Sequence, residues 1–190
     1  MLAPDSRAHG ESGGEFVTYG LLERHDVIAW ADWMRAQGCR NVDGLGESLG
    51  ASILIQAAAV KPVFNAIVAE CPFADLQAMA RYRVQKMAGG NAFVAGLVVD
   101  TGMLYADVFD HLDFRQVSPV ASMRSSITPV LLIHGLADWR TPPEQSRELF
   151  AARPLGTRLW LVPGAGHTEA SVVAPAEFRR RVLEWFGGFR

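Results

Sequence analysis

The chain has 190 residues, and its balance of 49% hydrophobic and 20% charged residues is that of an ordinary globular protein with a sizeable core. We therefore expect a single domain spanning residues 1–190. A formal net charge of −2 gives no basis for binding to nucleic acid or to an anionic membrane. We expect no apolar run to reach the length of a membrane span, and no secretory signal is visible, so the expected location is the cytoplasm.

Cysteine and histidine are too sparse to indicate a metal centre. The two cysteines, Cys39 and Cys71, have no metal-ligand spacing, and we interpret them as reduced, partly buried thiols. The five histidines include no pair spaced as ligands together with a carboxylate. The sequence therefore predicts that neither a metal nor an organic cofactor is needed.

The first part of the chain predicts a strand end, a polar connection and a helix. Residues 1–4 have the pattern of a strand that has lost its beginning, and residues 5–20 form a Gly-rich polar connection. Residues 21–37 carry an apolar face at helical spacing, and Gly38 follows them as a natural helix stop.

Residues 46–50, Gly-Glu-Ser-Leu-Gly, are the motif around which the prediction is built. A short strand-like run at residues 42–46 precedes Ser48, although Asp43 and Gly44 are poor strand residues, and an apolar, helix-forming run at residues 49–59 follows it. Strand, sharp turn and helix in this order predict a strained turn that presents a nucleophilic serine, with glycines where a Cβ would clash. The backbone N–H of Leu49, at the start of the helix, is then the natural first donor to a developing oxyanion.

A second Gly-x-Ser-x-Gly copy, around Ser12, shows that the motif alone is a weak signal. It lacks an apolar helix behind it, and a polar stretch stands in front of it. We therefore interpret residues 10–14 as a loop and Ser12 as a turn residue.

The rest of the chain alternates strands and helices. We expect strands at 63–69, 129–133 and 158–162, and helices at 76–87, 92–109, 119–124, 143–152 and 175–186. Such alternation predicts an α/β fold with a mostly parallel sheet and helices on both faces. Active sites of such sheets lie at the carboxyl ends of the strands, and Ser48, Asp138 and His167 each follow a predicted strand. Singly each could be a helix cap, a turn residue or a loop histidine, but the joint order disfavours that reading.

The order Ser48, Asp138, His167 resembles that of the α/β-hydrolase family. The segments His134-Gly135-x-x-Asp138 and Gly164-Ala165-Gly166-His167 are similar to the acid and histidine loops of that family, and residues 5–27 resemble a bacterial esterase-like branch. The resemblance implies that Ser48 is the nucleophile, His167 the general base and Asp138 the acid that orients the imidazole. Asp75, in the loop after the preceding strand, is the rival acid.

The resemblance also implies that the chain is N-terminally shortened, because residues 1–4 match the end of the fourth strand of the family. The loop that supplies the second oxyanion donor precedes that strand, so this donor is expected to be absent from the chain. The strand that leads to Gly46 should then become an edge strand beside the nucleophile. We expect a poorly soluble chain with weak or no activity.

The function implied by the resemblance is hydrolysis of a small-molecule carboxylic ester through an acyl-enzyme. Residues 76–124 should form a helical cap over Ser48. Its apolar residues either face an acyl or aromatic substrate or simply pack on the core: Phe93, Val94, Leu97, Val98, Val99, Met103 and Leu104. Two alternatives remain, peptide or thioester hydrolysis on the same triad and an inactive hydrolase-like protein. The substrate, the oligomeric state and the natural N-terminus stay open.

Overall fold

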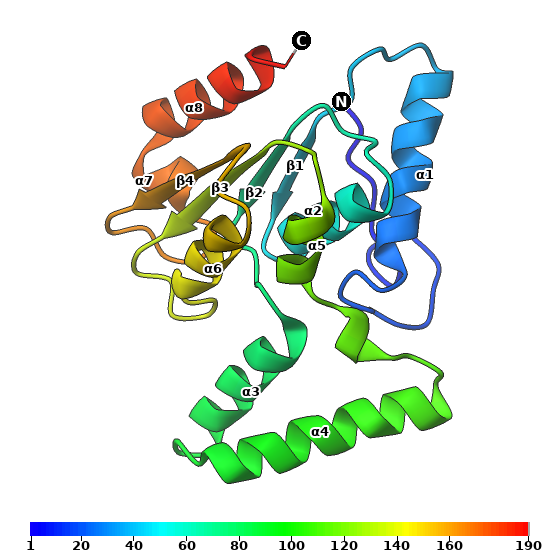
Figure 1. Ribbon diagram of the computed structural model, residues 1–190, viewed down its shortest axis with the longest axis vertical. Helices are drawn as coiled ribbons and strands as arrows, with labels where there is room; N and C mark the ends of the chain where they lie inside the picture. The colour runs from blue at the N-terminus through cyan, green and yellow to red at the C-terminus, as the bar shows by residue number, and fades with distance from the viewer. Residues whose placement is uncertain (190) are drawn as a thin grey trace.

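The computed structural model describes residues 1–189 and contains a four-stranded sheet in the order β1-β2-β3-β4 (Figure 1). All neighbouring strands pair in parallel. The strands are β1 (Gly44–Glu47), β2 (Ile67–Glu70), β3 (Val130–Gly135) and β4 (Thr157–Val162). Arg190, the last residue of the expected domain 1–190, lies outside the described residues.

Alternating residues of the two central strands build a core on each face of the sheet. In β2, Ile67 and Ala69 belong to one apolar cluster, while Val68 belongs to the other. In β3, Val130 and Leu132 alternate with Leu131 and Ile133 in the same way. Successive side chains of a strand point to opposite faces, so a strand covered on both faces must be apolar throughout. This requirement explains why residues 67–69 of β2 and 130–133 of β3 are continuous apolar runs.

Helices cover both faces of the sheet, which confirms the predicted α/β fold. One face carries α1 (Glu23–Ala36), α2 (Leu49–Val60), α5 (Pro119–Ser125) and α6 (Glu144–Ala152). The other face carries α7 (Ala170–Val173) and α8 (Pro175–Gly187), and the indole of Trp185 in α8 donates a hydrogen bond to the Ile67 carbonyl of β2 (3.0 Å).

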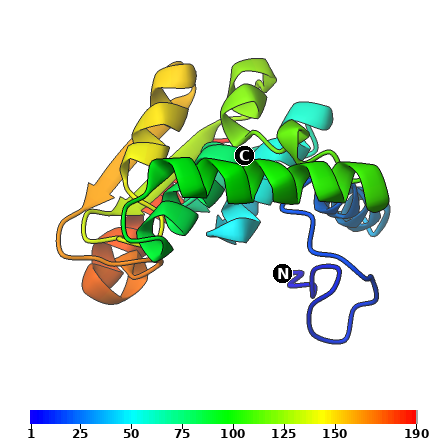
Figure 2. The ribbon, with the colours of Figure 1, turned by 90° about the horizontal axis from the view of Figure 1, so that it is seen from below.

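Two helices, α3 (Leu76–Met87) and α4 (Ala92–Phe109), lie apart from the sheet and its flanking helices (Figure 1). They follow the carboxyl end of β2 in the chain, and α4 runs across the underside of the molecule (Figure 2). A short 3-10 helix, η1 (Phe114–Gln116), leads back to α5. The bounds 76–124 and the role of these elements as a cap over Ser48 stay a prediction.

Helix α4 corrects one expectation about the sequence. Its 18 residues have a mean hydropathy of 1.5, which makes it long and apolar enough to cross a membrane by length and composition alone. The expectation that no apolar run reaches that length is therefore wrong. Only 17% of this 18-residue helix is buried in the folded chain.

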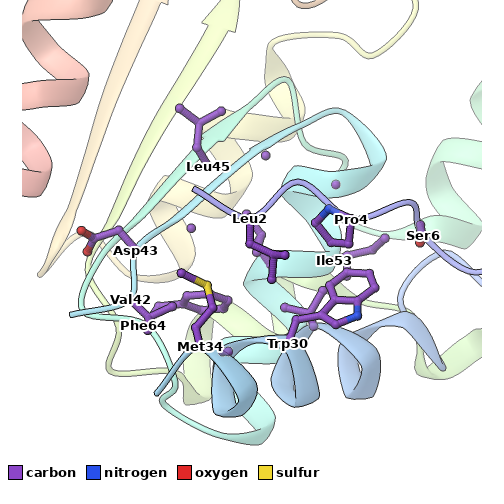
Figure 3. A pocket seen from close by; sticks show the side chains of 16 residues that line it. Leu2, Pro4, Ser6, Trp30, Met34, Val42, Asp43, Leu45, Ile53 and Phe64 are labelled. Carbon is purple, nitrogen blue, oxygen red and sulfur yellow. The ribbon is translucent and has the colours of Figure 1, made fainter. Parts of the chain in front are cut away.

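Strand β1 lies at the edge of the sheet, since within residues 1–189 it pairs with β2 alone. The expected strand end at residues 1–4 is not part of the sheet. Leu2 and Pro4 instead lie beside β1 with Trp30 and Ile53, where they line a cavity of about 260 Å³ (Figure 3). Pro4 has no N–H to donate to a strand ladder, so it cannot supply a donor for pairing with β1.

The second predicted strand starts later than expected. Residues 63–66 are not in β2 and form the irregular connection that leads into it. The Asn65 side chain accepts a hydrogen bond from the Val42 N–H (3.1 Å), and the Asn65 N–H donates to the Val42 carbonyl (2.8 Å). Asn65 therefore joins the segments that precede β1 and β2 in the chain rather than the strands themselves.

Candidate active site

The turn between β1 and α2 places Ser48 in strained backbone. Ser48 has φ 50° and ψ −112°, and its N–H donates to the Glu70 carbonyl at the end of β2 (2.7 Å). A positive φ is uncommon outside glycine and marks a functional candidate. The neighbouring strand therefore holds the serine in a conformation that it would otherwise disfavour.

Only one of the two glycines beside Ser48 is required by sterics. A Cβ at Gly46 would lie 2.7 Å from the Ala51 nitrogen and 2.7 Å from the Gly50 carbonyl carbon, which are backbone atoms. A Cβ at Gly50 would meet nothing within 4 Å. The expectation that both neighbours must lack a Cβ thus holds for Gly46 and is wrong for Gly50.

The structure brings Ser48, His167 and Asp138 into one hydrogen-bonded chain. His167 Nε2 lies 2.8 Å from Ser48 Oγ, and His167 Nδ1 lies 2.7 Å from Asp138 Oδ2. The three residues follow β1, β4 and β3, so the parallel sheet gathers them at the carboxyl ends of its strands.

The Asp138 carboxylate is buried among hydrogen-bond donors. Burial acts to raise its pKa, but hydrogen bonds from His134, from the Thr141 N–H and from His167 outweigh that effect and lower the pKa well below its usual range. Asp138 Oδ1 also accepts the Arg140 N–H (2.9 Å). An ionised Asp138 requires His167 to donate from Nδ1, so Nε2 is left to accept the Ser48 hydroxyl proton.

His134 is a neighbour of the acid that the sequence did not assign to the site. Its ring is fully buried, with Nδ1 2.6 Å from Ser146 Oγ and Nε2 2.7 Å from the Thr141 carbonyl. Nε2 also lies 3.3 Å from Asp138 Oδ2. The spacing His134-x-x-x-Asp138 was visible in the sequence, but nothing in it showed that the imidazole contacts the Asp138 carboxylate.

Cys71 lies beside the same cluster. Its Sγ accepts the Thr168 N–H (3.4 Å), and burial raises the pKa of its thiol to about 12. One ligand atom each from Cys71, Asp138 and His167 lie within 4.8 Å of one another, a spacing that could hold a metal ion. At neutral pH, however, the thiol is protonated and the imidazole and carboxylate already share a hydrogen bond. The absence of a metal requirement stays a prediction.

The two rival residues make hydrogen bonds to other parts of the chain. The Asp75 carboxylate accepts the Ala78 N–H (3.0 Å) and is the N-cap of α3. Ser12 Oγ donates to the Asp5 carbonyl (2.8 Å) in an exposed loop. Asp75 and Ser12 therefore have structural roles in α3 and in the N-terminal loop.

Leu49 is the first residue of α2, directly after the serine. N–H groups in the first turn of a helix have no partner within the helix, so this one is placed to meet a negative oxygen near Ser48. Its role as an oxyanion donor, and the absence of a second donor from the chain, stay predictions.

Comparison with known proteins places this chain in a family. Residues 2–188 match the model of the prolyl oligopeptidase family. An uncharacterised Bacillus subtilis protein, YqkD, is 25% identical over 97% of this chain and 61% of its own length. The uncharacterised Mycobacterium tuberculosis protein Rv2307c is 28% identical over 91% of this chain and 54% of its own length. The chain thus spans somewhat more than half the length of these curated relatives.

Solved structures share the fold. The Pyrococcus furiosus esterase Pf2001 has a TM-score of 0.74 at 23% identity, covering 97% of this chain and 69% of that one. A puromycin-hydrolyzing peptidase from Mycobacterium tuberculosis has a TM-score of 0.68 at 22% identity, covering 90% and 26%. The fold is therefore that of the α/β-hydrolases, and the chain belongs to the prolyl oligopeptidase family.

Proposed function

We propose that this chain hydrolyses a small-molecule carboxylic ester, with Ser48 as the nucleophile of an acyl-enzyme. The observation that carries the proposal is the continuous chain of hydrogen bonds from Ser48 Oγ through His167 to Asp138. A weak nucleophile, a base within hydrogen-bond distance and a third group that orients the base are the arrangement that acyl transfer needs.

The roles follow from the geometry. Ser48 attacks the ester carbonyl while His167 Nε2 takes the hydroxyl proton, and the resulting imidazolium is stabilised by the buried Asp138 carboxylate. The same proton then passes from Nε2 to the alcohol that leaves. Water repeats the sequence on the acyl-enzyme and releases the acid. The Leu49 N–H is the donor for the oxyanion in both halves of the reaction.

Hydrolysis of an aminoacyl amide is the second candidate. The family match and the puromycin-hydrolyzing peptidase among the solved structures favour it, because the same three residues can cleave an amide. Amides differ from esters in their poorer leaving group, so an enzyme built for them needs proton delivery from the imidazole more strictly.

A matched substrate panel separates the two candidates. We expect p-nitrophenyl acyl esters of short and medium chain length to be cleaved faster than the matching aminoacyl p-nitroanilides and acyl thioesters. Ser48→Ala should abolish turnover of every substrate that the wild-type chain cleaves. Faster cleavage of the anilides would favour peptidase function, and residual turnover in Ser48→Ala would contradict the proposed nucleophile.

A further inference from the structure

Helix α4 presents a continuous apolar stripe to solvent. Phe93 and Phe109 near its two ends are 80% and 66% exposed, and Leu97 and Leu104 between them are each 61% exposed. Simple packing on the core, one of the two roles expected for the apolar residues of this helix, is thus wrong for most of them. The stripe consists of Phe93, Val94, Leu97, Val98, Thr101, Leu104, Tyr105, Val108 and Phe109.

The opposite side of α4 is the one that holds the helix on the protein. Ala95, Val99 and Ala106 are buried, and Ala106 joins the apolar cluster that α4 shares with α3 and η1. Two acids lie at the border between the two sides. Asp100 pairs with Arg81 (2.7 Å) and Asp107 pairs with Arg115 (2.6 Å), so partners on the same chain already neutralise them. The stripe itself therefore carries no charge.

The stripe is nearly symmetric about its central residue, Thr101. Equal steps in both directions from Thr101 reach Phe93 and Phe109, Val94 and Val108, Leu97 and Tyr105, and Val98 and Leu104. At about 100° per residue, each such pair lies at equal and opposite angles from Thr101 around the helix. Only small side chains, Thr101 and Gly102, stand at the centre, where two crossing helices come closest.

From this symmetry we propose that two copies of the chain associate through antiparallel α4 helices, with the two-fold axis passing beside Thr101. A two-fold interface uses the same patch on both subunits, so a surface that fits it must be complementary to itself when reversed. In the proposed dimer Phe93 of one copy packs against Phe109 of the other copy, and Leu97 of one copy packs against Tyr105 of the other. The inference rests on the fold and the exposed side chains, and it holds whether or not the proposed hydrolase reaction is correct.

A lipid membrane could also cover an apolar helix face, but the charged residues of α4 disfavour a membrane. Helices that lie on membranes carry Lys and Arg on their polar side, which meet anionic headgroups. Helix α4 contains no Lys or Arg; its charged residues are Asp100 and Asp107, and Asp110 follows at its end. With Asp100 and Asp107 already paired, α4 offers no Lys or Arg of its own to anionic headgroups, whereas a second copy of the chain needs none.

Solution mass is the first test. Sedimentation velocity of the full chain should give twice the 20.7 kDa mass of one copy, and Leu97→Glu should return it to one copy. The matched control is Leu155→Glu, which also exposes a charge in place of an exposed leucine (87%) but lies in the turn before β4. It should stay dimeric. Circular dichroism of both variants reports on the fold. The proposal would be overturned if the wild-type chain sediments as a monomer, or if both folded variants become monomeric to the same extent.

Cross-linking tests the register. With the exposed Cys39 changed to Ser, Thr101→Cys should cross-link to its own copy with a short bis-maleimide, because both copies of residue 101 lie at the axis. Val108→Cys alone should not, since its two copies lie about 21 Å apart along the helix. An equal mixture of Val94→Cys and Val108→Cys chains should cross-link. Cross-linking of Val108→Cys alone, or flotation of a monomeric chain with phosphatidylcholine vesicles, would exclude this interface.

Discussion

At the scale of single residues, the chemistry of the site is set by what surrounds Asp138. A carboxylate out of contact with water is costly unless donors satisfy it, and here the Arg140 and Thr141 N–H groups and two imidazoles do so. The charge on Asp138 is thus stable across the neutral range, and it fixes the tautomer of His167.

The first prediction separates Asp138 from its rival. Asp138→Asn should lower kcat about 10⁴-fold, because the amide leaves the imidazole in the wrong tautomer. Asp75→Asn should leave kcat unchanged, since Asp75 caps α3 while His167 Nδ1 is bonded to Asp138. Asparagine is itself a good N-cap, so the stability of this control should change little. A larger loss of kcat in Asp75→Asn than in Asp138→Asn would reverse the assignment.

The second prediction concerns His134, whose imidazole lies beside the Asp138 carboxylate. His134→Asn removes the donor that reaches Asp138 and cannot span from Ser146 to Thr141, so kcat should fall about tenfold with KM unchanged. The free energy of unfolding should fall by about 1–3 kcal/mol, the cost of leaving buried groups unpaired.

Ser146→Ala is the matched control for His134. It removes the hydrogen bond to Nδ1 but keeps the imidazole beside Asp138. Steady-state kinetics and urea unfolding of both variants should show similar losses of stability but a loss of kcat only in His134→Asn. A loss of kcat of similar size in Ser146→Ala would mean that His134 acts only through packing.

At the scale of elements, the turn after β1 stores the strain that presents Ser48. The third prediction uses its two glycines as a matched pair. Gly46→Ala forces a Cβ against the backbone at the start of α2 and should lower the free energy of unfolding by about 1–3 kcal/mol. Gly50→Ala points into open space and should be neutral or slightly stabilising, since alanine favours a helix. Urea unfolding checks both. Equal destabilisation by both changes would contradict the steric account.

Helix α7 depends on a buried acid at the end of β2. Glu70 Oε1 accepts the Ala170 N–H (3.0 Å), and burial raises the pKa of its carboxyl despite that hydrogen bond. A carboxyl whose pKa is higher in the folded than in the unfolded chain favours folding while it is protonated. This contribution is fully present below the unfolded pKa, about 4.3, and is lost as pH rises through the folded value.

The fourth prediction follows from that sign. Glu70→Gln keeps a carbonyl oxygen for the Ala170 N–H and cannot ionise, so it should gain stability relative to the wild-type chain between pH 4 and pH 7. Urea unfolding across that range measures the difference. Glu47→Gln is the control, because Glu47 lies in register with Glu70 on β1 but stays exposed to water. A relative stability of Glu70→Gln that falls with rising pH would contradict the raised pKa.

Much of the element order could be predicted from the sequence, because β2 and β3 begin with continuous apolar runs and the helices carry clear starts and stops. The predicted bounds of α3 and α4 agree with the structure. Helix α7 was missed because four residues carry no periodicity, and η1 was missed for the same reason. The strand assigned to residues 1–4 failed because pairing depends on a neighbour in space, which local pattern does not reveal.

The site itself was predictable only in part. The order of Ser48, Asp138 and His167 could be read because each follows a strand, and parallel strands gather their carboxyl ends. The contacts of His134, the thiol of Cys71 and the anchoring role of Glu70 could not. They arise where β2, β3 and the loop after β4 meet, and residues far apart in the chain come together there only through the sheet register.

At the scale of the whole molecule, two surfaces expose features that single domains usually cover. Strand β1 pairs on one side alone within residues 1–189, and an unpaired strand edge invites pairing with another chain. The N-terminal Leu2 and Pro4 lie beside that edge (Figure 3). Across the molecule, the apolar stripe of α4 is exposed to solvent. Both features predict that association, rather than core packing, governs how the chain behaves in solution.

The central claim is that Ser48, held by the turn after β1 and paired with His167, is the nucleophile. The most direct test is to treat the chain with a fluorophosphonate and to locate the adduct by peptide mass spectrometry. We predict an adduct on Ser48 that is lost in Ser48→Ala and kept in Ser12→Ala, which alters the other Gly-x-Ser-x-Gly copy. An adduct on Ser12, or a folded chain in which no serine reacts, would contradict this account.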